Sequence, residues 1–301
     1  MFGKILKDFK RNKFKYLLVL LPLIYLLIFA YKPMYGLIIV FQKFRPSAGI
    51  DGSPWVGLDN FRRFFNDIYF WRLLRNTFSI SALSIIFSFP MPIILALLLN
   101  EVKSGKFKRT VQTITYMPHF IAIVVVCSLI KTFTASNGVI NDLIAALGGE
   151  RTNLLANGAL FYPIYIISGI WQNIGWDSII YLAALSGIDQ EQYEAAKVDG
   201  AGRMKQMWYI TLPGLLPTIS MLLVLRLGSV LSVGYEKILL LYQPTIYEVA
   251  DVISTYVYRK GLLDADFSYS AAVGLFNSLV NIVFLLVSNK LSKKLGQSGL
   301  F

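Results

Sequence analysis

Residues 267–289 read FSYSAAVGLFNSLVNIVFLLVSN and contain no charged side chain. As an α-helix, this stretch is long enough to cross the roughly 30 Å of hydrocarbon in a bilayer. Comparable apolar stretches recur along the chain, separated by clusters of charged residues. Because 55% of the 301 residues are hydrophobic and only 15% are charged, one soluble core could not bury so much apolar surface. The pattern predicts an all-α, polytopic membrane protein.

Six stretches have the length and low charge of a membrane-spanning helix. We expect these spans at about 16–41, 77–100, 110–132, 159–185, 212–236 and 267–289. Together they form one membrane domain over 16–290, preceded by a basic segment, 1–15, and followed by a short tail, 291–301. The first span lacks a convincing small-residue cleavage site, so we interpret it as an uncleaved helix rather than a secretory signal.

The distribution of lysine and arginine predicts the orientation. An even number of crossings places both termini on one side of the membrane. Segments expected on that side hold 16 Lys and Arg residues, against nine on the other side, six of which lie in 42–77. The positive-inside rule therefore favours cytoplasmic termini in a multi-pass protein of the cell membrane. Aromatic residues at helical spacing within 42–77 fit either an amphipathic helix in the outer interface or an ordinary connecting helix.

Composition also excludes several functions. The formal charge is +12, but the basic residues flank apolar segments instead of forming one soluble basic face, so we expect no nucleic-acid binding. Cys127 is the only cysteine and His119 the only histidine, which leaves no disulfide framework and no cysteine-ligated metal cluster. Because HExxH, GxSxG and P-loop patterns are absent from the sequence, we expect no catalytic residues and no metal site in this chain.

The loop between the fourth and fifth predicted spans, 186–213, reads SGIDQEQYEAAKVDGAGRMKQMWYITLP. Asp189 can cap a short helix that a left-handed Gly200 would end. A second helix is expected from about Ala201 toward Pro213, which suits the first turn of the next span. The small residues of this loop would let a partner surface approach its backbone closely, although a plain surface helix-turn-helix fits the spacing equally well.

This loop resembles the EAA loop of binding-protein-dependent ABC import permeases. The resemblance lies in three parts, Glu194-Ala-Ala, Asp199-Gly-Ala and Ile210-Thr-Leu-Pro213. The place of this loop, between the fourth and fifth spans, resembles that in the carbohydrate-uptake, maltose-permease-like branch of the family. Two further stretches resemble the same branch, Trp55-Val-Gly-Leu-Asp-Asn-Phe61 and Tyr116-Met-Pro-His-Phe120. In its overall sequence the chain resembles the subfamily associated with aldouronates and other acidic oligosaccharides. The resemblance implies a type I ABC importer permease that moves an oligosaccharide into the cell, and a uronate-containing one is our hypothesis.

The same resemblance implies a set of partners. These are a second, related permease in a heterodimer, two cytoplasmic ATPase subunits that bind ATP and Mg²⁺, and an extracellular or periplasmic solute-binding protein. The loop helix would insert into a cleft on an ATPase and couple nucleotide-driven closure to the membrane bundle. The residues expected at this contact are Glu194, Ala195, Ala196, Asp199, Gly200, Ala201, Gly202, Leu212 and Pro213.

Polar side chains within the spans are costly, so each is expected to line a cavity or to pair with a neighbour. Arg226, roughly midway along the fifth span, could meet an anionic substrate, or Asp177, Glu236 or a partner chain could neutralise it. Aromatic and amide groups suit sugar rings and hydroxyls, but they also occur at membrane interfaces and between helices. The candidates for the substrate path are Trp171, Gln172, Asn173, Trp176, Arg226, Ser229, Asn277 and Asn281.

Three alternatives compete with an importer of acidic oligosaccharides. The substrate could be a neutral oligosaccharide or another solute, because specificity is shared with the solute-binding protein and the second permease. A stand-alone secondary transporter would need coupling-ion sites and usually shows broken helices or inverted halves. A structural membrane protein would give no reason for the loop at 186–213.

Overall fold

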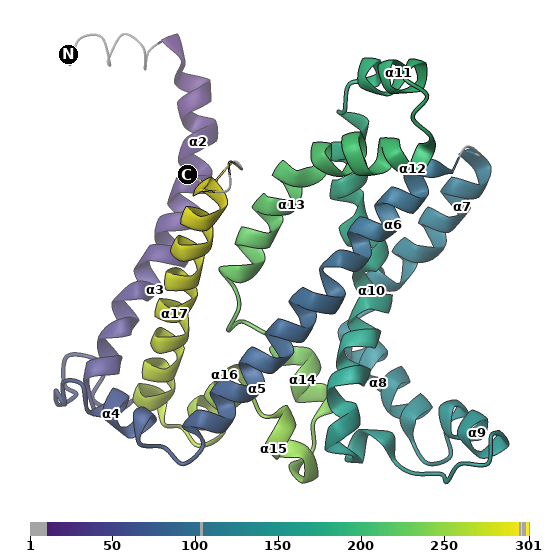
Figure 1. The fold of residues 1–301 in the computed structure, drawn as a ribbon. Helices are drawn as coiled ribbons and strands as arrows, with labels where there is room; N and C mark the ends of the chain where they lie inside the picture. The colour runs from purple at the N-terminus through teal and green to yellow at the C-terminus, as the bar shows by residue number, and fades with distance from the viewer. Residues whose placement is uncertain (1–10, 103–104, 295, 297–298, 301) are drawn as a thin grey trace. The chain divides into compact units, whose positions relative to one another are not determined.

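The computed structural model describes residues 11–102, 105–294, 296 and 299–300. Regular structure in these residues is helical, apart from two isolated β-bridges within 42–55 (Figure 1). The all-α prediction is therefore confirmed for the described part of the chain. Most of the predicted basic segment, 1–15, and part of the predicted tail, 291–301, lie outside the described residues.

The chain forms two compact units. The first comprises residues 1–67 and 257–275, and the second comprises residues 68–256 and 276–301. The first unit contains a nearly continuous helical segment made of α2 (Lys13–Leu26), the π-helical η1 (Leu27–Tyr31), α3 (Lys32–Met34) and the 3-10 segment η2 (Tyr35–Phe41). Most of the large apolar side chains along it are exposed, which suits contact with lipid.

Helix α4 (Asp59–Phe65) packs onto the part of α17 (Phe267–Lys294) that belongs to the first unit. Phe64 is fully buried, and its ring meets the ring of Tyr269 edge to face at 6.4 Å. Arg63 pairs with Asp266 at 2.7 Å and covers the ring of Tyr269. Phe65, next to the buried Phe64, is half exposed. One face of α4 therefore packs within its own unit while the other faces outward.

The second unit contains the remaining helices. In chain order they are α5 (Phe70–Leu83), η3 (Ser84–Ser88), α6 (Pro90–Glu101), α7 (Gly105–Tyr116), η4 (Met117–Phe120), α8 (Ile123–Thr134), α9 (Val139–Ala146), η5 (Leu154–Ala156), α10 (Gly158–Ser186), α11 (Gln190–Val198), α12 (Arg203–Gln206), η6 (Met207–Thr211), α13 (Leu212–Leu227), α14 (Tyr235–Leu241), η7 (Pro244–Ile246) and α15 (Tyr247–Ala250). Helix α16 (Ile253–Tyr258), like α17, has residues in both units, and η8 (Arg259–Leu263) belongs to the first.

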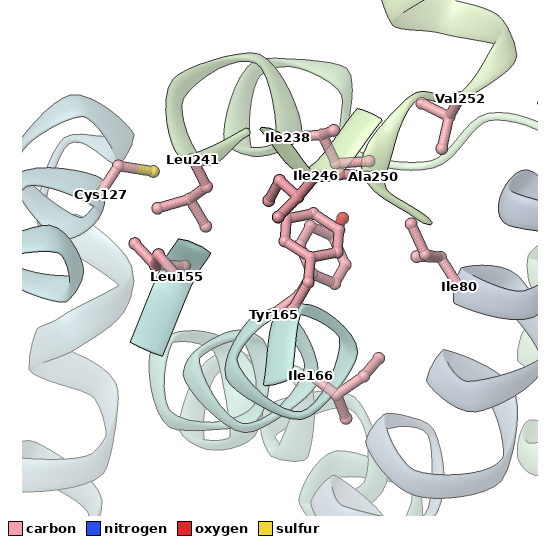
Figure 2. Packing of buried hydrophobic residues seen from close by; sticks show 11 residues of the cluster. Ile80, Cys127, Leu155, Tyr165, Ile166, Ile238, Leu241, Ile246, Ala250 and Val252 are labelled. Carbon is pink, nitrogen blue, oxygen red and sulfur yellow. The ribbon is translucent and has the colours of Figure 1, made fainter. Parts of the chain in front are cut away.

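Helix α10 is the centre of the second unit, where it packs against α6, α7 and α13. Near its beginning, Phe161 and Tyr165 join Ile238 of α14 and Cys127 of α8 in a buried apolar cluster. Figure 2 shows Tyr165 pointing toward Ile238 and Ile246, which belong to segments that follow α13 in the sequence. This cluster fixes α14 against α10 in the interior of the unit.

The predicted spans differ in how well they match helices. Five segments of the described chain are long and apolar enough to cross a membrane: Lys13–Phe41, Phe70–Glu101, Ile123–Ala146, Arg203–Leu227 and Phe267–Lys294. The fourth predicted span, 159–185, lies in α10, a 29-residue helix that carries a polar stretch at 171–177. Six crossings therefore stay a prediction.

Two predicted spans contain breaks that hydropathy does not reveal. Within 110–132, the backbone becomes extended at Ile121 and Ala122, so α7 and α8 are separate helices. Pro118, in the 3-10 turn just before this break, has no N–H to donate to a continuing helix. Within 212–236, helix α13 already ends at Leu227, and a non-helical segment leads to α14.

One side chain of another helix satisfies a backbone group of the second break. Asn281 of α17 accepts a hydrogen bond from the backbone N–H of Leu231 at 2.9 Å and donates one to the Ser232 hydroxyl at 2.9 Å. A broken helix is tolerated within a membrane protein when neighbouring groups satisfy the freed backbone in this way. Asn281 therefore has a packing role. The sequence allowed this role as the alternative to substrate contact.

A close approach between α10 and the end of α7 depends on Gly175. A Cβ atom at this position would overlap the backbone carbonyl of Thr115. Backbone atoms cannot move aside as a flexible side chain can, so the two segments would have to separate. Small residues allow such close helix contacts in membrane proteins.

We therefore expect Gly175→Ala to lower the free energy of unfolding of the chain by about 1–3 kcal/mol, the usual cost of overpacking. The matched control is Gly274→Ala in α17, where an added Cβ would meet no atom within 4 Å. Thermal unfolding of both variants in detergent would measure the difference. Equal midpoints for the two variants would contradict the close packing of α10 on α7.

Candidate functional site

A cavity of about 880 Å³ opens in the second unit, with walls from η3, α6, η4, α8, α10, α13 and α14 and from the break before α14. Its polar and charged lining is Ser84, Ser88, His119, Tyr165, Gln172, Asn173, Asp177, Tyr181, Arg226, Ser229, Tyr235, Glu236 and Lys237. Apolar residues such as Ile170, Ile180 and Leu222 line the rest. The cavity thus combines hydrogen-bonding groups, charges of both signs and apolar surface, the mixture expected of a site for a polar organic molecule.

Arg226 lies in the last turn of α13 and lines this cavity. Because α13 ends at Leu227, Arg226 lies next to the break within the predicted span 212–236. Asp177 and Glu236 line the same cavity, yet neither forms an ion pair with Arg226 in the described part of the chain. Among the residues described, the guanidinium therefore faces the cavity without a bound carboxylate.

The other predicted substrate-path residues divide into two groups. Gln172, Asn173 and Ser229 line the cavity. The four residues outside its lining are Trp171, Trp176, Asn277 and Asn281, of which Trp171 and Trp176 are 47% and 42% exposed. The side-chain oxygen of Asn277 is buried and has no hydrogen-bond partner in the described chain.

Trp176 stacks on His119, which lines the cavity and which the sequence did not single out as a candidate. The two rings are stacked, with centroids 4.6 Å apart and planes inclined by 2°. His119 Nδ1 also lies 3.0 Å from the side-chain oxygen of Asn173. Phe120 adds an edge-to-face contact with Trp176. The 3-10 turn η4 is therefore anchored to α10 by an aromatic stack and one polar contact.

Lys237 is a second lining residue that the sequence analysis missed. It is only 7% exposed and follows Glu236 at the start of α14. Its ammonium donates a hydrogen bond to the backbone carbonyl of Tyr165 at 3.0 Å and lies over the Tyr165 ring. Lys237 lies outside the candidate membrane-spanning helices, and burial lowers its pKa to about 8. The sequence shows only that this lysine directly precedes an apolar run. Its burial in the cavity wall depends on the fold and could not be predicted from that pattern.

A second candidate site is the loop at 186–213, whose first helix, α11, has no buried residue. The Asp189 carboxylate accepts a hydrogen bond from the backbone N–H of Glu191 at 3.0 Å, which confirms the predicted N-cap. Gly200 has a φ of +75°, and the Ala201 N–H donates to the Ala196 carbonyl at 2.8 Å. This is the hydrogen-bond pattern of a Schellman motif, and it confirms the predicted left-handed stop.

The second half of the loop runs into α13 without a break. Helix α12 begins at Arg203, and a π-helical turn at Met207–Thr211 precedes Pro213 in the first turn of α13. Because proline has no N–H, it cannot complete the regular hydrogen-bond pattern, which accounts for the widened turn. The Tyr193 hydroxyl lies 3.0 Å from the Thr211 hydroxyl and so ties α11 to this turn.

The described residues contain no group of three or more His, Cys, Asp or Glu side chains that could hold a metal ion. Residues 88–297 match the family described as "Binding-protein-dependent transport system inner membrane component". The chain belongs to this family. It is therefore a multi-pass membrane permease subunit of an ABC importer and no enzyme, and ATP hydrolysis takes place on a separate subunit.

Similar proteins agree with this membership. The permease subunit is 47% identical to the polygalacturonan/rhamnogalacturonan transport system permease protein YteP of Bacillus subtilis (strain 168), over 97% of this chain and 91% of that protein. It is also 47% identical to protein LplB of the same organism, over 97% of this chain and 92% of LplB.

Solved structures give the same result. A chain in the crystal structure of a bacterial ABC transporter involved in the import of the acidic polysaccharide alginate matches with a TM-score of 0.90 at 47% identity, over 97% of this chain and 99% of that one. A second match, with a TM-score of 0.90 and 46% identity, covers 98% of this chain and 99% of that one. It comes from a bacterial alginate ABC transporter in complex with an alginate pentasaccharide-bound periplasmic protein.

We predict that His119→Ala lowers the free energy of unfolding by about 1 kcal/mol, because it removes the aromatic stack on Trp176. His119→Phe keeps a ring at this position and should recover most of the loss. Thermal unfolding of the permease in detergent compares the two variants. If His119→Phe is no more stable than His119→Ala, the stack does not anchor η4 to α10.

Proposed function

We propose that this permease forms part of the path of an acidic, uronate-containing oligosaccharide during ATP-driven import. The observation that carries the proposal is the cavity lined by Arg226, a cation without a carboxylate partner among the described residues. Uronate sugars carry a carboxylate that a guanidinium can bind through two parallel hydrogen bonds. The relatives support the same class, since one is named for polygalacturonan and rhamnogalacturonan transport and two structures for alginate.

The uncharged lining suits the remainder of a sugar chain. Gln172, Asn173 and Ser229 offer amide and hydroxyl groups that can bind sugar hydroxyls. These groups also suit a neutral oligosaccharide, which is the second candidate cargo, and relatives named for arabinooligosaccharide and lactose transport fit that reading. Arg226 favours the acidic cargo, because a guanidinium forms stronger, charge-assisted hydrogen bonds with a carboxylate than with a sugar hydroxyl.

We further propose that the loop helix α11 docks on a cytoplasmic ATPase subunit that binds ATP and Mg²⁺. Both ends of α11 are fixed, by Asp189 and by Gly200, and Val198 near its end is 88% exposed. Two residues, Glu194 and Asp199, supply charge for the contact. Small residues allow the ATPase to approach closely, at Ala195, Ala196, Ala201 and Gly202. The helix that carries the motion begins at Leu212 and Pro213. In this arrangement the termini are cytoplasmic, and a solute-binding protein docks on the opposite side.

The proposal includes a second permease, a related sister chain rather than another copy of this one. The broken helices within 110–132 and 212–236 are also found in stand-alone secondary transporters, so this feature does not separate the two classes. Purification distinguishes a secondary transporter from an importer subunit, because an autonomous carrier would be isolated alone and would transport without ATP. We expect the permease to copurify with a second permease and two ATPase subunits.

Replacing Arg226 with Gln removes the charge and keeps hydrogen-bonding capacity. In proteoliposomes that contain the complete importer, we predict that Arg226→Gln reduces uptake of a galacturonate trisaccharide roughly tenfold, the size expected for one lost hydrogen bond to a charged group. Uptake of a neutral trisaccharide should change by less than about twofold on the same scale. Equal losses for the acidic and neutral sugars would reject acidic cargo as the reason for Arg226.

The coupling role of α11 can be tested at its glycines. At both Gly200 and Gly202 an added Cβ would meet no atom within 4 Å, but only Gly200 has a positive φ. We therefore expect Gly200→Ala to cost about 1–2 kcal/mol in the local fold and to lower substrate-stimulated ATP hydrolysis. Gly202→Ala should have a smaller effect. Unchanged assembly and unchanged stimulated hydrolysis in Gly200→Ala would contradict the proposed contact.

A further inference from the structure

Lys237 places a second positive charge at the wall of the cavity, on an element different from the one that carries Arg226. It belongs to α14, whereas Arg226 belongs to α13, and non-helical residues separate the two helices. Lys237 is buried, but it lines the same cavity as Arg226. The buried cluster around Ile238 and Tyr165 holds α14 in place, so the position of the ammonium group is defined by packing.

The surroundings of Lys237 do not neutralise it. In the described chain, Arg63, Arg72, Arg75, Arg151 and Lys260 each pair with an acidic side chain. No such pair includes Lys237, although Asp177 and Glu236 line the same cavity. A buried cation without a carboxylate is costly, so an anion that enters the cavity would be bound favourably.

The contacts of the ammonium leave room for another acceptor. A lysine ammonium has three N–H donors. One donates to the Tyr165 carbonyl at 3.0 Å, and the Tyr165 ring lies 4.8 Å from the nitrogen. Gly169, which also lines the cavity, has no side chain to cover the group, and a Cβ there would lie 3.4 Å from Lys237 Nζ. Two of the three N–H donors therefore have no hydrogen bond in the described chain, and Lys237 lines the cavity.

We propose that Lys237 is a specificity-determining residue that binds a carboxylate of the passing oligosaccharide, separately from Arg226. This inference rests on the proposed function, because it requires acidic cargo in this cavity. A chain of uronate sugars presents one carboxylate on each ring, so two cations on different elements can engage two different rings. Lys237 supplies a compact point charge on a flexible stem, whereas Arg226 supplies a planar group suited to two-point binding.

The chief alternative is a structural role, in which Lys237 only ties α14 to α10 through the Tyr165 carbonyl. The two roles differ in one readout. A structural anchor affects every substrate alike, while a carboxylate-binding residue affects the acid and spares its ester. The probes are therefore a galacturonate trisaccharide and its methyl ester, which have the same sugar rings but differ in charge.

The test uses the complete importer in proteoliposomes, with Lys237→Met to remove the charge and Lys237→Gln as a second variant. Lys131→Met is the matched control, because Lys131 is exposed on α8 and is not part of the cavity lining. We expect both Lys237 variants to lower the preference for the acid over the ester roughly tenfold. Lys131→Met should keep the preference of the unmodified importer.

Each other outcome overturns the proposal. If acid and ester uptake fall equally, or if neither variant assembles with its partners, Lys237 is an anchor for α14. If the unmodified importer prefers the acid and Arg226→Gln removes that preference while Lys237→Met does not, the proposed function stands and only the role of Lys237 fails. If the unmodified importer shows no preference for the acid, the proposed function fails and the role of Lys237 fails with it.

Discussion

A positive charge that is taken out of water is costly without an anionic partner, and in the second unit of the permease this constraint applies to Lys237, which is 7% exposed. Arg226, by contrast, is exposed. Arg226 and Lys237 reach one cavity from α13 and α14, and neither is paired with a carboxylate in the part of the chain that the structure describes. Asp177 and Glu236 in the same walls keep the cavity from being uniformly positive. In our account, the charge that completes this site arrives with the substrate, and departs when the substrate leaves.

The cavity and the loop helix are connected through the same two helices. Helix α10 carries Asn173 and Asp177 and ends at Ser186, where the loop begins. The helical run that begins at Arg203 ends next to the cavity at Leu227. A Cβ at Gly214 of α13 would lie 2.7 Å from the side chain of Ile188, which follows α10. Leu185 of α10 and Leu215 of α13 share a buried cluster, so the two helices are in contact at the base of the loop. A displacement of the loop can therefore be transmitted to both walls, as coupling between two sites requires.

Features set by local chemistry could be predicted from the sequence. The caps at Asp189 and Gly200 depend on neighbouring backbone groups, and the helical class follows from long apolar runs. The break at Ile121 could not be found by hydropathy, because the residues around it are as apolar as those of a helix, and Pro118 alone was an ambiguous signal. Lys237 was missed because its burial arises from packing between α10 and α14, which are distant in the sequence.

The most direct measurement is a structure of the complete importer trapped with a galacturonate oligosaccharide by a non-hydrolysable ATP analogue. Our account predicts sugar density in the cavity bounded by α10, α13 and α14, with one carboxylate at hydrogen-bonding distance from Arg226 and α11 seated in a cleft of an ATPase subunit. Sugar density on a path that avoids this cavity, or an α11 that contacts no ATPase subunit, would contradict it.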